Sequence, residues 1–335
     1  FGPQHGINGQ TQANMIEWEP DGHFEGVPVY SLYGKTRKPL PKMLEGLDIV
    51  VVDMQDCGSR YYTYIWTLFL FMREAEKSGI EIIVVDRPNP IGLRKTEGGP
   101  VQKGFESFVG LCSIPVRHGM TIGETALFFR KKYFPGCSIK VLPMENYGVD
   151  TSYYETGLQW VMPSPNMPFC GTAMVYPGMC LLEATGISEG RGTCRPFEIF
   201  GAPYIDTSEI LKVFEEKDLP GCVFRETGFI PVFDKFSGEL CRGFQIHITD
   251  QDSFLPLLTG MTVISEIRKM YPSDFKWVDP PYEYEYEKMP IDILTGSSLF
   301  RETVDSGGDI NLLNSQYSEY PSSFYEEAGE CFIYD

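Results

Sequence analysis

Carboxylate side chains in loops are the residues of this sequence best suited to acid–base chemistry. One such reaction is the cleavage of a glycosidic bond, which needs an acid to protonate the leaving oxygen and a second group to attack or stabilise the oxocarbenium-like centre. Residue type and spacing do not rank the candidates among themselves. They are Asp53 and Asp56 in DMQDCG, Glu97 in EGGP, Glu124 in RHGMTIGE and Glu189 in SEGRGT.

Some of the loop acids also have a structural interpretation, while Glu189 is more suggestive of a functional role. Glu124 stands three residues after a threonine, which is the spacing of a helix capping box. Asp53 and Asp86 can end strands and hold adjacent loops by accepting backbone hydrogen bonds. Glu189 lies in a segment too rich in glycine for a helix and two positions before Arg191, whose charge would keep the carboxylate ionised.

Two histidines lie in glycine-containing loops of the same kind. At His5 and His118 an imidazole can donate to a sugar hydroxyl or act as a general acid, and a structural role is the alternative for each. With Asp53 and Asp56 they could form a metal site, but the paired histidine spacing typical of such sites is missing. We therefore predict no metal and no other cofactor.

Arginines and other polar residues of these loops are candidates for substrate binding in a chain whose formal net charge is −18. A guanidinium binds a carboxylate through two hydrogen bonds, so an arginine here can recognise an acidic substituent such as a lactyl group. The alternative is that the arginines pair with Asp53, Asp56, Asp86 or Glu189. The arginines are Arg60, Arg87, Arg117 and Arg191; the further candidates are Gln4, Tyr62, Asn89 and Asn166.

Strands and helices of the α/β class must position these groups. Two apolar β-branched runs, Leu47 to Asp53 and Ile80 to Asp86, each end in an acid and are typical of buried parallel strands. Helical spacing over Tyr64 to Lys77 joins them, and Ile122 to Tyr133 and Ser138 to Leu142 predict a further helix and strand. Because ligands bind outside the carboxyl ends of such strands, the loops after them should line the site.

The pattern changes in the second part of the chain. Val223 to Phe229 and Gly243 to Thr249 predict strands, and Phe254 to Met270 predicts a helix. We therefore predict a Rossmann-like parallel sheet layered with helices over residues 1–196 and a smaller C-terminal α+β domain over residues 197–335. The active-site cleft is expected between the two.

Composition argues against several classes of function. The content of 42% hydrophobic and 22% charged residues is typical of globular proteins, and the negative charge disfavours nucleic acid and acidic membrane surfaces. Neither a dinucleotide-binding nor a Walker-type glycine motif is present. Four prolines interrupt the longest uncharged run, which argues against a membrane span. Nine cysteines without a Cys-x-x-Cys pair are expected to be mostly buried thiols.

One short segment near the C-terminus alternates two residue types. Tyr and Glu alternate over Tyr282 to Tyr286. This alternation predicts an extended segment with one packed and one solvated face, rather than an acidic ligand site.

Loop motifs along nearly the whole chain carry a family resemblance. In order they are FGPQHG, VYSLYG, DMQDCGSRYYTY, DRPNP, EGGP, RHGMTIGE, WVMPSPNMP, YPG, SEGRGTCRPFEIFGAP and DILTGSSLFR. This series resembles the NamZ-type exo-β-N-acetylmuramidase family. The resemblance implies removal of non-reducing-end β-linked N-acetylmuramic acid from peptidoglycan fragments, without metal or nucleotide.

Two departures from the family pattern bear on this implication. Members carry a strand-helix-strand portion before the first motif, so we expect this chain to lack that portion of its first domain. The family motif usually has Glu where this sequence has Gln4, and the resemblance would make that Glu the catalytic acid. An amide does not donate a proton as a carboxylic acid does. The alternative to an enzyme is therefore a muropeptide-binding protein with impaired catalysis.

Substrate-assisted hydrolysis would require only one protein acid, because the 2-acetamido group of the sugar can act as the nucleophile. We predict Glu189 or Glu124 in this role, with Glu97 as a further candidate. We expect His5 and Asp56 to orient the sugar. Arg60 or Arg191 is expected to hold the lactyl carboxylate.

The expected partner is a peptidoglycan-derived saccharide or muropeptide, with no nucleic acid and no membrane span. A metal-dependent hydrolase of another polar substrate is a more distant alternative. The family resemblance favours a periplasmic or secreted location, while cysteines without a disulfide pattern favour the cytoplasm as the alternative.

Overall fold

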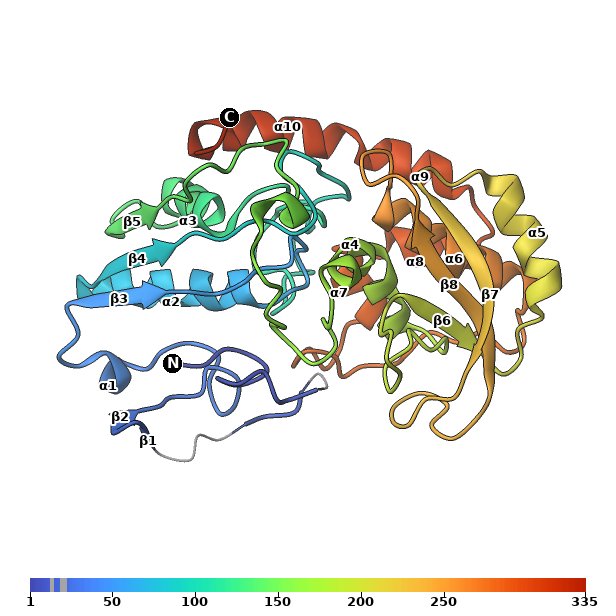
Figure 1. The fold of residues 1–335 in the computed structure, drawn as a ribbon, viewed down its shortest axis with the longest axis horizontal. Helices are drawn as coiled ribbons and strands as arrows, with labels where there is room; N and C mark the ends of the chain where they lie inside the picture. Colours follow the sequence, from blue (N-terminus) through green and yellow to red (C-terminus); the bar gives the residue numbers. More distant parts are fainter. Residues whose placement is uncertain (13–14, 19–22) are drawn as a thin grey trace. The chain divides into compact units, whose positions relative to one another are not determined.

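The chain folds into two compact units, each built from segments that are distant in sequence (Figure 1). The computed structural model describes residues 1–12, 15–18 and 23–335. The predicted boundary between residues 196 and 197, and the cleft predicted between the domains, stay predictions. Unit 1 comprises Phe1–Lys95, His118–Met167 and Ser323–Asp335, and unit 2 comprises Thr96–Arg117 and Pro168–Ser322.

Unit 1 contains a parallel sheet with the strand order β3-β4-β5. Its strands are β3 (Ile49–Val52), β4 (Glu81–Val85) and β5 (Ile139–Leu142), and the register sets Val50 opposite Ile82. The β-branched runs therefore form the strands that the sequence predicts, in the parallel arrangement expected of them.

The connections between these strands are helices α2 (Tyr64–Ser78) and α3 (Ile122–Lys132), which pack against each other and against β4. An aromatic cluster fills this contact, with the rings of Trp66, Phe69 and Phe129 within 6.1 Å of one another. The remaining elements of unit 1 are β1 (His23–Phe24), β2 (Val27–Pro28), α1 (Pro41–Leu44), η1 (Tyr153–Thr156) and η3 (Gly329–Cys331).

Unit 2 is an α+β body around an antiparallel sheet of order β6-β8-β7. The strands are β6 (Ile199–Ala202), β7 (Cys222–Phe229) and β8 (Cys241–Ile248), and buried phenylalanines from the sheet pack with Phe214 of a helix. The helices are α4 (Cys170–Met179), η2 (Cys180–Ala184), α5 (Thr207–Lys217), α6 (Pro256–Met270), α7 (Pro290–Thr295), α8 (Leu299–Asp305) and α9 (Ile310–Tyr317); α10 (Glu319–Ala328) leads from unit 2 back into unit 1.

Helices α4 and α6 cross at two glycines. A Cβ atom on Gly178 would lie 1.8 Å from the backbone oxygen of Pro256, and one on Gly260 would lie 2.2 Å from the oxygen of Gly178. Neither backbone can accommodate a side chain at this distance. The crossing therefore requires glycine on both helices.

We expect Gly178→Ala to lower the free energy of unfolding of unit 2 by about 1–3 kcal/mol, since the added methyl group forces the helices apart. Urea unfolding followed by circular dichroism measures this change. Gly329→Ala is the matched control, because no atom lies within 4 Å of a Cβ at Gly329. Equal stabilities of the two variants would contradict the close crossing.

The segment from Tyr282 to Tyr286 differs from its prediction. It forms a tight turn in which Tyr282 and Glu285 exchange two backbone hydrogen bonds of 2.9 Å. Glu283 and Tyr284 have φ angles of 46° and 64°, in the left-handed region, so the side chains do not alternate between two faces. The prediction of an extended segment is wrong, because alternation of residue types does not reveal a positive φ.

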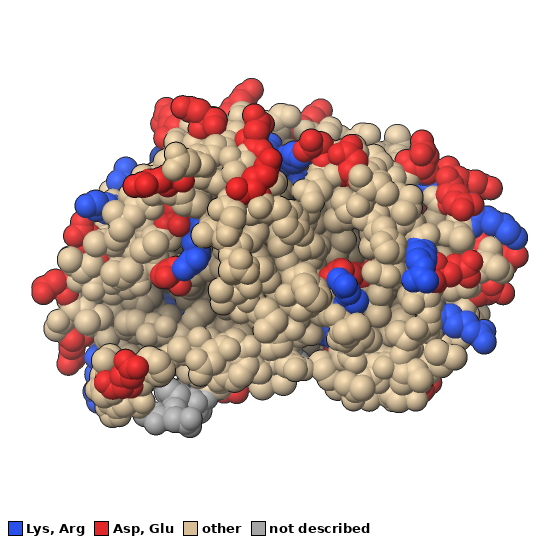
Figure 2. All heavy atoms as spheres, in the orientation of Figure 1, with Lys and Arg blue, Asp and Glu red and all other residues tan. Residues whose placement is uncertain are grey.

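Surface composition follows the charge of the chain. Acidic side chains are spread over the face shown in Figure 2, with basic ones scattered between them. Eight of the nine cysteines are buried, as predicted, and Cys194 is exposed. Among the described residues, no helix combines the length and the apolar character needed to cross a bilayer.

Candidate functional site

Two loops at the carboxyl ends of β3 and β4 form the frame of the candidate site in unit 1. Parallel neighbouring strands end at the same edge, so the loops that follow Val52 and Val85 begin side by side. Two contacts join them. Arg87 Nε lies 2.5 Å from Asp53 Oδ1, and Gln55 Nε2 donates to the carbonyl oxygen of Pro88 at 2.9 Å.

Asp56 and His118 form a buried pair although 62 positions separate them. Asp56 Oδ2 accepts from the backbone N–H of Gly58 at 2.7 Å and lies 3.2 Å from His118 Nε2. His118 Nδ1 accepts from the backbone N–H of Met120 at 3.3 Å. Because Nδ1 accepts, Nε2 is the ring nitrogen that donates to Asp56.

Gln4 and His5 lie in a tight turn beside the start of α2. The hydroxyl of Thr63 donates to Gln4 Oε1 at 2.5 Å, which fixes the orientation of a side chain that is only 4% exposed. His5 has a φ of 74°, its Nδ1 lies 2.7 Å from the carbonyl oxygen of Thr11, and its ring stacks on Tyr62. The turn therefore holds an amide and an imidazole in fixed orientations.

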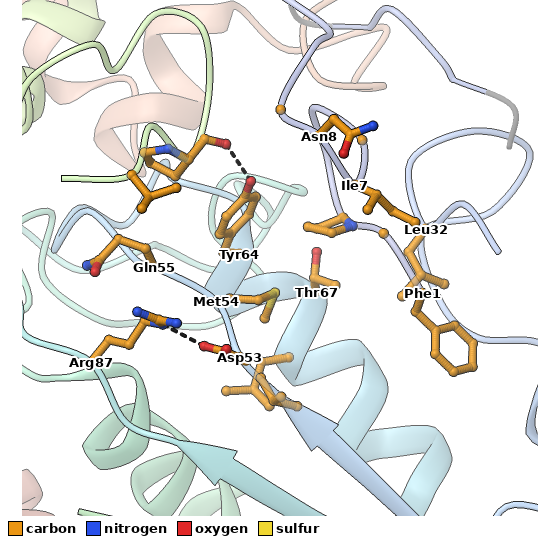
Figure 3. A pocket seen from close by; sticks show the side chains of 18 of the residues that line it. Phe1, Ile7, Asn8, Leu32, Asp53, Met54, Gln55, Tyr64, Thr67 and Arg87 are labelled. Atoms are coloured by element: carbon orange, nitrogen blue, oxygen red, sulfur yellow. Dashed lines mark hydrogen bonds and ion pairs between the residues drawn. The ribbon is translucent and has the colours of Figure 1, made fainter. Parts of the chain in front are cut away.

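A cavity of about 610 Å³ lies next to this turn in unit 1 (Figure 3). Its polar wall is the ion pair of Asp53 and Arg87 together with Gln55, and its apolar wall includes Phe1 and Leu68. The N-terminal turn that contains Gln4 and His5 also lines the cavity, through the residues on either side of these two. The cavity is large enough for a small saccharide.

Glu124 has a full set of structural partners. It forms the predicted capping box with Thr121, and both its carboxylate oxygens accept from Arg94, at 3.0 and 3.1 Å. The backbone N–H of Ile333 donates to the same carboxylate at 2.9 Å. Since the side chain is fully buried and bound to a guanidinium, these contacts favour the capping role over proton donation.

We expect Glu124→Gln to lower the free energy of unfolding of unit 1 by about 1–3 kcal/mol, because the guanidinium of Arg94 loses its charged partner. Urea unfolding measures this effect. Glu155→Gln, which removes the charge from the exposed capping box of η1, is the matched control and should cost less. Unchanged stability of Glu124→Gln would count against the structural role.

The loop after β4 is held by its own polar side chains. Asp86 accepts from the hydroxyls of Thr121 and Tyr334, each at 2.7 Å, and burial raises the pKa of its carboxyl group. Asn89 accepts from the backbone N–H of Ile91 and donates to Met120. Asp86 thus has the contacts of its predicted structural alternative, and Asn89, predicted to bind substrate, also has structural contacts. Both side chains support the loop that carries Arg87.

Three other predicted residues of unit 1 have mainly structural surroundings. Arg60 is fully buried, and its backbone oxygen accepts from the indole N–H of Trp66 at 2.7 Å. Tyr62 packs edge-on against Tyr64. Asn166 donates to the carbonyl oxygen of Gln12 at 2.6 Å and so joins two loops.

Glu97 belongs to unit 2, where its side chain contacts the first turn of α6. Its carboxylate accepts from the backbone N–H of Leu257 at 3.1 Å and lies 3.3 Å from Arg117 Nη1. Burial raises the pKa of Glu97, against the opposing influence of Arg117. Arg117 therefore has a structural partner, but this partner is Glu97 and not one of the four acids that were predicted to pair with the arginines.

Glu189 and Arg191 also belong to unit 2 and lie in a buried ionic network. Glu189 contacts Lys235 Nζ at 2.8 Å and Arg191 Nε at 3.3 Å. Arg191 also pairs with Glu183 at 2.6 Å, and the hydroxyl of Tyr282 donates to Glu183 at 2.6 Å. Two carboxylates and two cations thus balance one another.

The structure brings the predicted residues together in two sets. Sequence reasoning missed Ser59, Thr63 and Arg94 in the first unit and Glu183 and Lys235 in the second. Ser59 and Thr63 lie in the motif DMQDCGSRYYTY, whereas the other three lie outside the quoted motifs. Within the ranges that the structure describes, no three His, Cys, Asp or Glu side chains are grouped as metal ligands. Unit 1 holds Gln4, His5, Asp56, Arg60, Tyr62, Arg87, Asn89, His118, Glu124 and Asn166, and unit 2 holds Glu97, Glu189 and Arg191.

This fold and site define a two-unit α/β protein with buried polar groups at the carboxyl edge of a short parallel sheet. The family model described as exo-β-N-acetylmuramidase NamZ, N-terminal, matches residues 1–170, and the C-terminal model matches residues 174–334. The chain belongs to this family.

Relatives of known sequence or structure agree with this assignment. The peptidoglycan β-N-acetylmuramidase NamZ of Bacillus subtilis (strain 168) is 40% identical over 334 residues, covering 100% of this chain and 79% of the relative. A crystal structure of a DUF1343 family protein from Bacteroides fragilis matches with a TM-score of 0.88 and 32% identity, over 100% of this chain and 85% of that one. A second protein of that description from the same organism gives a TM-score of 0.71 and 25% identity, over 92% and 80%.

Proposed function

We propose that this protein is a glycoside hydrolase that removes non-reducing-end β-linked N-acetylmuramic acid from peptidoglycan fragments. The observation that carries the proposal is the 40% identity, along the full chain, to a peptidoglycan β-N-acetylmuramidase. Polar loops at the carboxyl edge of the parallel sheet supply a suitable site in unit 1. The partner of this site is a peptidoglycan-derived saccharide or muropeptide.

His5 is the proton donor that the contacts favour. Glu124 and Glu189 are each paired with a cationic side chain, Arg94 and Lys235, and so have structural partners. An imidazolium can protonate a leaving oxygen near neutral pH. The hydrogen bond from His5 Nδ1 to the carbonyl oxygen of Thr11 orients the ring and assigns proton exchange with the substrate to Nε2.

The substrate itself supplies the nucleophile in this proposal. The 2-acetamido oxygen attacks the anomeric carbon as the bond to the leaving oxygen breaks, and the proton from His5 passes to that oxygen. Water then opens the cyclic intermediate and restores the proton. Gln4 contributes an oriented amide that can hydrogen-bond the sugar.

The test is time-resolved release of N-acetylmuramic acid from a disaccharide that carries this sugar at its non-reducing end, in metal-stripped buffer. His5→Asn is the variant that tests the proton donor. Asn is chosen because it tolerates the left-handed φ of 74° at this position. We expect release by the unmodified protein and a loss of roughly 100-fold in the variant. Absence of release from the unmodified protein would contradict the proposal.

A muropeptide-binding protein with impaired catalysis is the second candidate function, and Gln4 is the observation that favours it. A buried amide can hold a sugar group but supplies no acid. This candidate predicts saturable binding of the disaccharide without product, and it is contradicted if the unmodified protein turns the disaccharide over.

For the cellular location, we propose the periplasm or the exterior of the cell, where peptidoglycan lies. Cell fractionation followed by immunoblotting tests this proposal. Recovery of the protein only with cytoplasmic markers would contradict it and would agree with eight buried cysteine thiols in a reducing compartment.

A further inference from the structure

Two buried polar atoms of the loop after β3 have no hydrogen-bond partner among the described residues. They are Asp56 Oδ1 and Ser59 Oγ, on side chains that are 4% and 0% exposed. Burial of a polar group without a hydrogen bond costs free energy, so such atoms are rare in folded proteins. Two of them three residues apart indicate that this loop meets a polar partner.

The contacts of Asp56 determine which chemistry its second oxygen offers. Oδ2 accepts from the backbone N–H of Gly58 and from the Nε2–H of His118, so the carboxylate cannot rotate without losing both bonds. Oδ1 is thereby held as an acceptor. The hydroxyl of Ser59 can donate, so the two side chains together offer one acceptor and one donor.

We propose that Asp56 and Ser59 recognise the 2-acetamido group of the bound sugar. Oδ1 of Asp56 accepts from the amide N–H, and the hydroxyl of Ser59 donates to the amide oxygen. A secondary amide carries a donor and an acceptor in one planar group, which matches this pair. The lactyl carboxylate carries acceptors only and would be repelled by Asp56. The inference rests on the function proposed above and names the sugar group that this loop selects.

The decisive variant is Asp56→Asn. Gly58 and His118 both donate, so the oxygen of the new amide must face them and its NH2 group must occupy the place of Oδ1. The substitution thus exchanges an acceptor for a donor with almost no change in shape. A ligand N–H at this position would then meet another donor.

The experiment compares two ligands by calorimetric titration: N-acetylmuramic acid and the same sugar with a hydrogen atom in place of the 2-acetamido group. We expect the unmodified protein to prefer N-acetylmuramic acid by roughly 10- to 100-fold, because the counterpart leaves Oδ1 unpaired. Asp56→Asn should lose this preference while its thermal unfolding midpoint stays within a few degrees.

A serine variant gives an independent readout. Ser59→Ala removes a buried hydroxyl that has no partner in the described part of the chain, so stability should stay equal or rise while affinity for N-acetylmuramic acid falls by roughly 3- to 10-fold. Ser265→Ala is the matched control. Ser265 is also fully buried without a described partner, but it lies on α6 of unit 2, and its replacement should leave affinity unchanged.

Retained preference for the acetamido group in Asp56→Asn would overturn the inference and would mean that Oδ1 meets only water. Release of N-acetylmuramic acid by the unmodified protein would show in that case that the proposed function itself holds. If the unmodified protein neither binds nor releases the sugar, the proposed function fails and this inference fails with it.

Discussion

Gln4→Glu is expected to raise the rate of N-acetylmuramic acid release by roughly 10²- to 10⁴-fold under the second candidate function, in which the unmodified protein lacks a general acid. Glu has nearly the shape of Gln, and the hydroxyl of Thr63 can donate to the carboxyl group as it does to Gln4 Oε1. The position is only 4% exposed, and burial raises the pKa of a carboxyl group. Burial therefore favours the protonated form of the new side chain.

Initial rates of release over a range of pH measure this effect. Since the acid must be protonated to act, the rate of the Gln4→Glu variant should fall as pH rises through the raised pKa of the new carboxyl group. Gln159→Glu is the matched control, because Gln159 is an exposed glutamine beside the same cavity and should cause no activation.

The outcome separates the two candidate functions. Release by the variant alone would identify the unmodified protein as a binder that has lost its acid. Equal rates for both proteins would show that the acid lies elsewhere, with His5 as the first residue to examine.

Arg191→Met is expected to lower the free energy of unfolding of unit 2 by about 3–5 kcal/mol, the usual cost of removing one partner from a buried ion pair. Arg191 lies between Glu183 and Glu189, at 2.6 and 3.3 Å. Without the guanidinium, both carboxylates remain buried and only Lys235 balances them. Methionine fills much of the same volume, so the loss of stability measures the effect of removing the positive charge.

The contribution of the Glu183–Arg191 pair to stability should depend on pH. Burial would raise the pKa of Glu183, but the charge of Arg191 and hydrogen bonds from Arg191 and Tyr282 hold it below its ordinary value. A lowered pKa stabilises the folded state above the unfolded-state pKa of about 4.3, and this contribution is lost as pH falls through the folded-state pKa. The difference between Arg191→Met and the unmodified protein should therefore narrow in acid.

Guanidinium unfolding at pH 7 and at decreasing pH measures both effects. Arg195→Met is the matched control, since its ion pair with Glu198 at 3.0 Å involves an arginine side chain that is 44% exposed. Such pairs contribute about 0–1 kcal/mol. A similar loss of stability in both variants would contradict a larger contribution from the buried ion pairs than from the exposed one.

The local elements of this protein were determined by its sequence. The apolar runs before Asp53 and Asp86 form the parallel strands β3 and β4, and the spacing of Thr121 and Glu124 forms the predicted capping box. Such features depend on hydrogen bonds and side-chain spacing within a few residues, so a linear pattern is sufficient to predict them. The family motifs are equally readable, because they lie in continuous loops.

The roles of the charged residues were decided only by the tertiary structure. Glu124 meets the N–H of Ile333 from 209 positions away, and Asp56 meets His118 from 62 positions away. Whether a carboxylate can donate a proton depends on which cations and donors surround it after folding, and these come from distant segments. The sequence therefore defined the loops and their candidates. The fold determined that Glu124 and Glu189 are paired with cations and that Asp56 Oδ1 has no hydrogen-bond partner among the described residues.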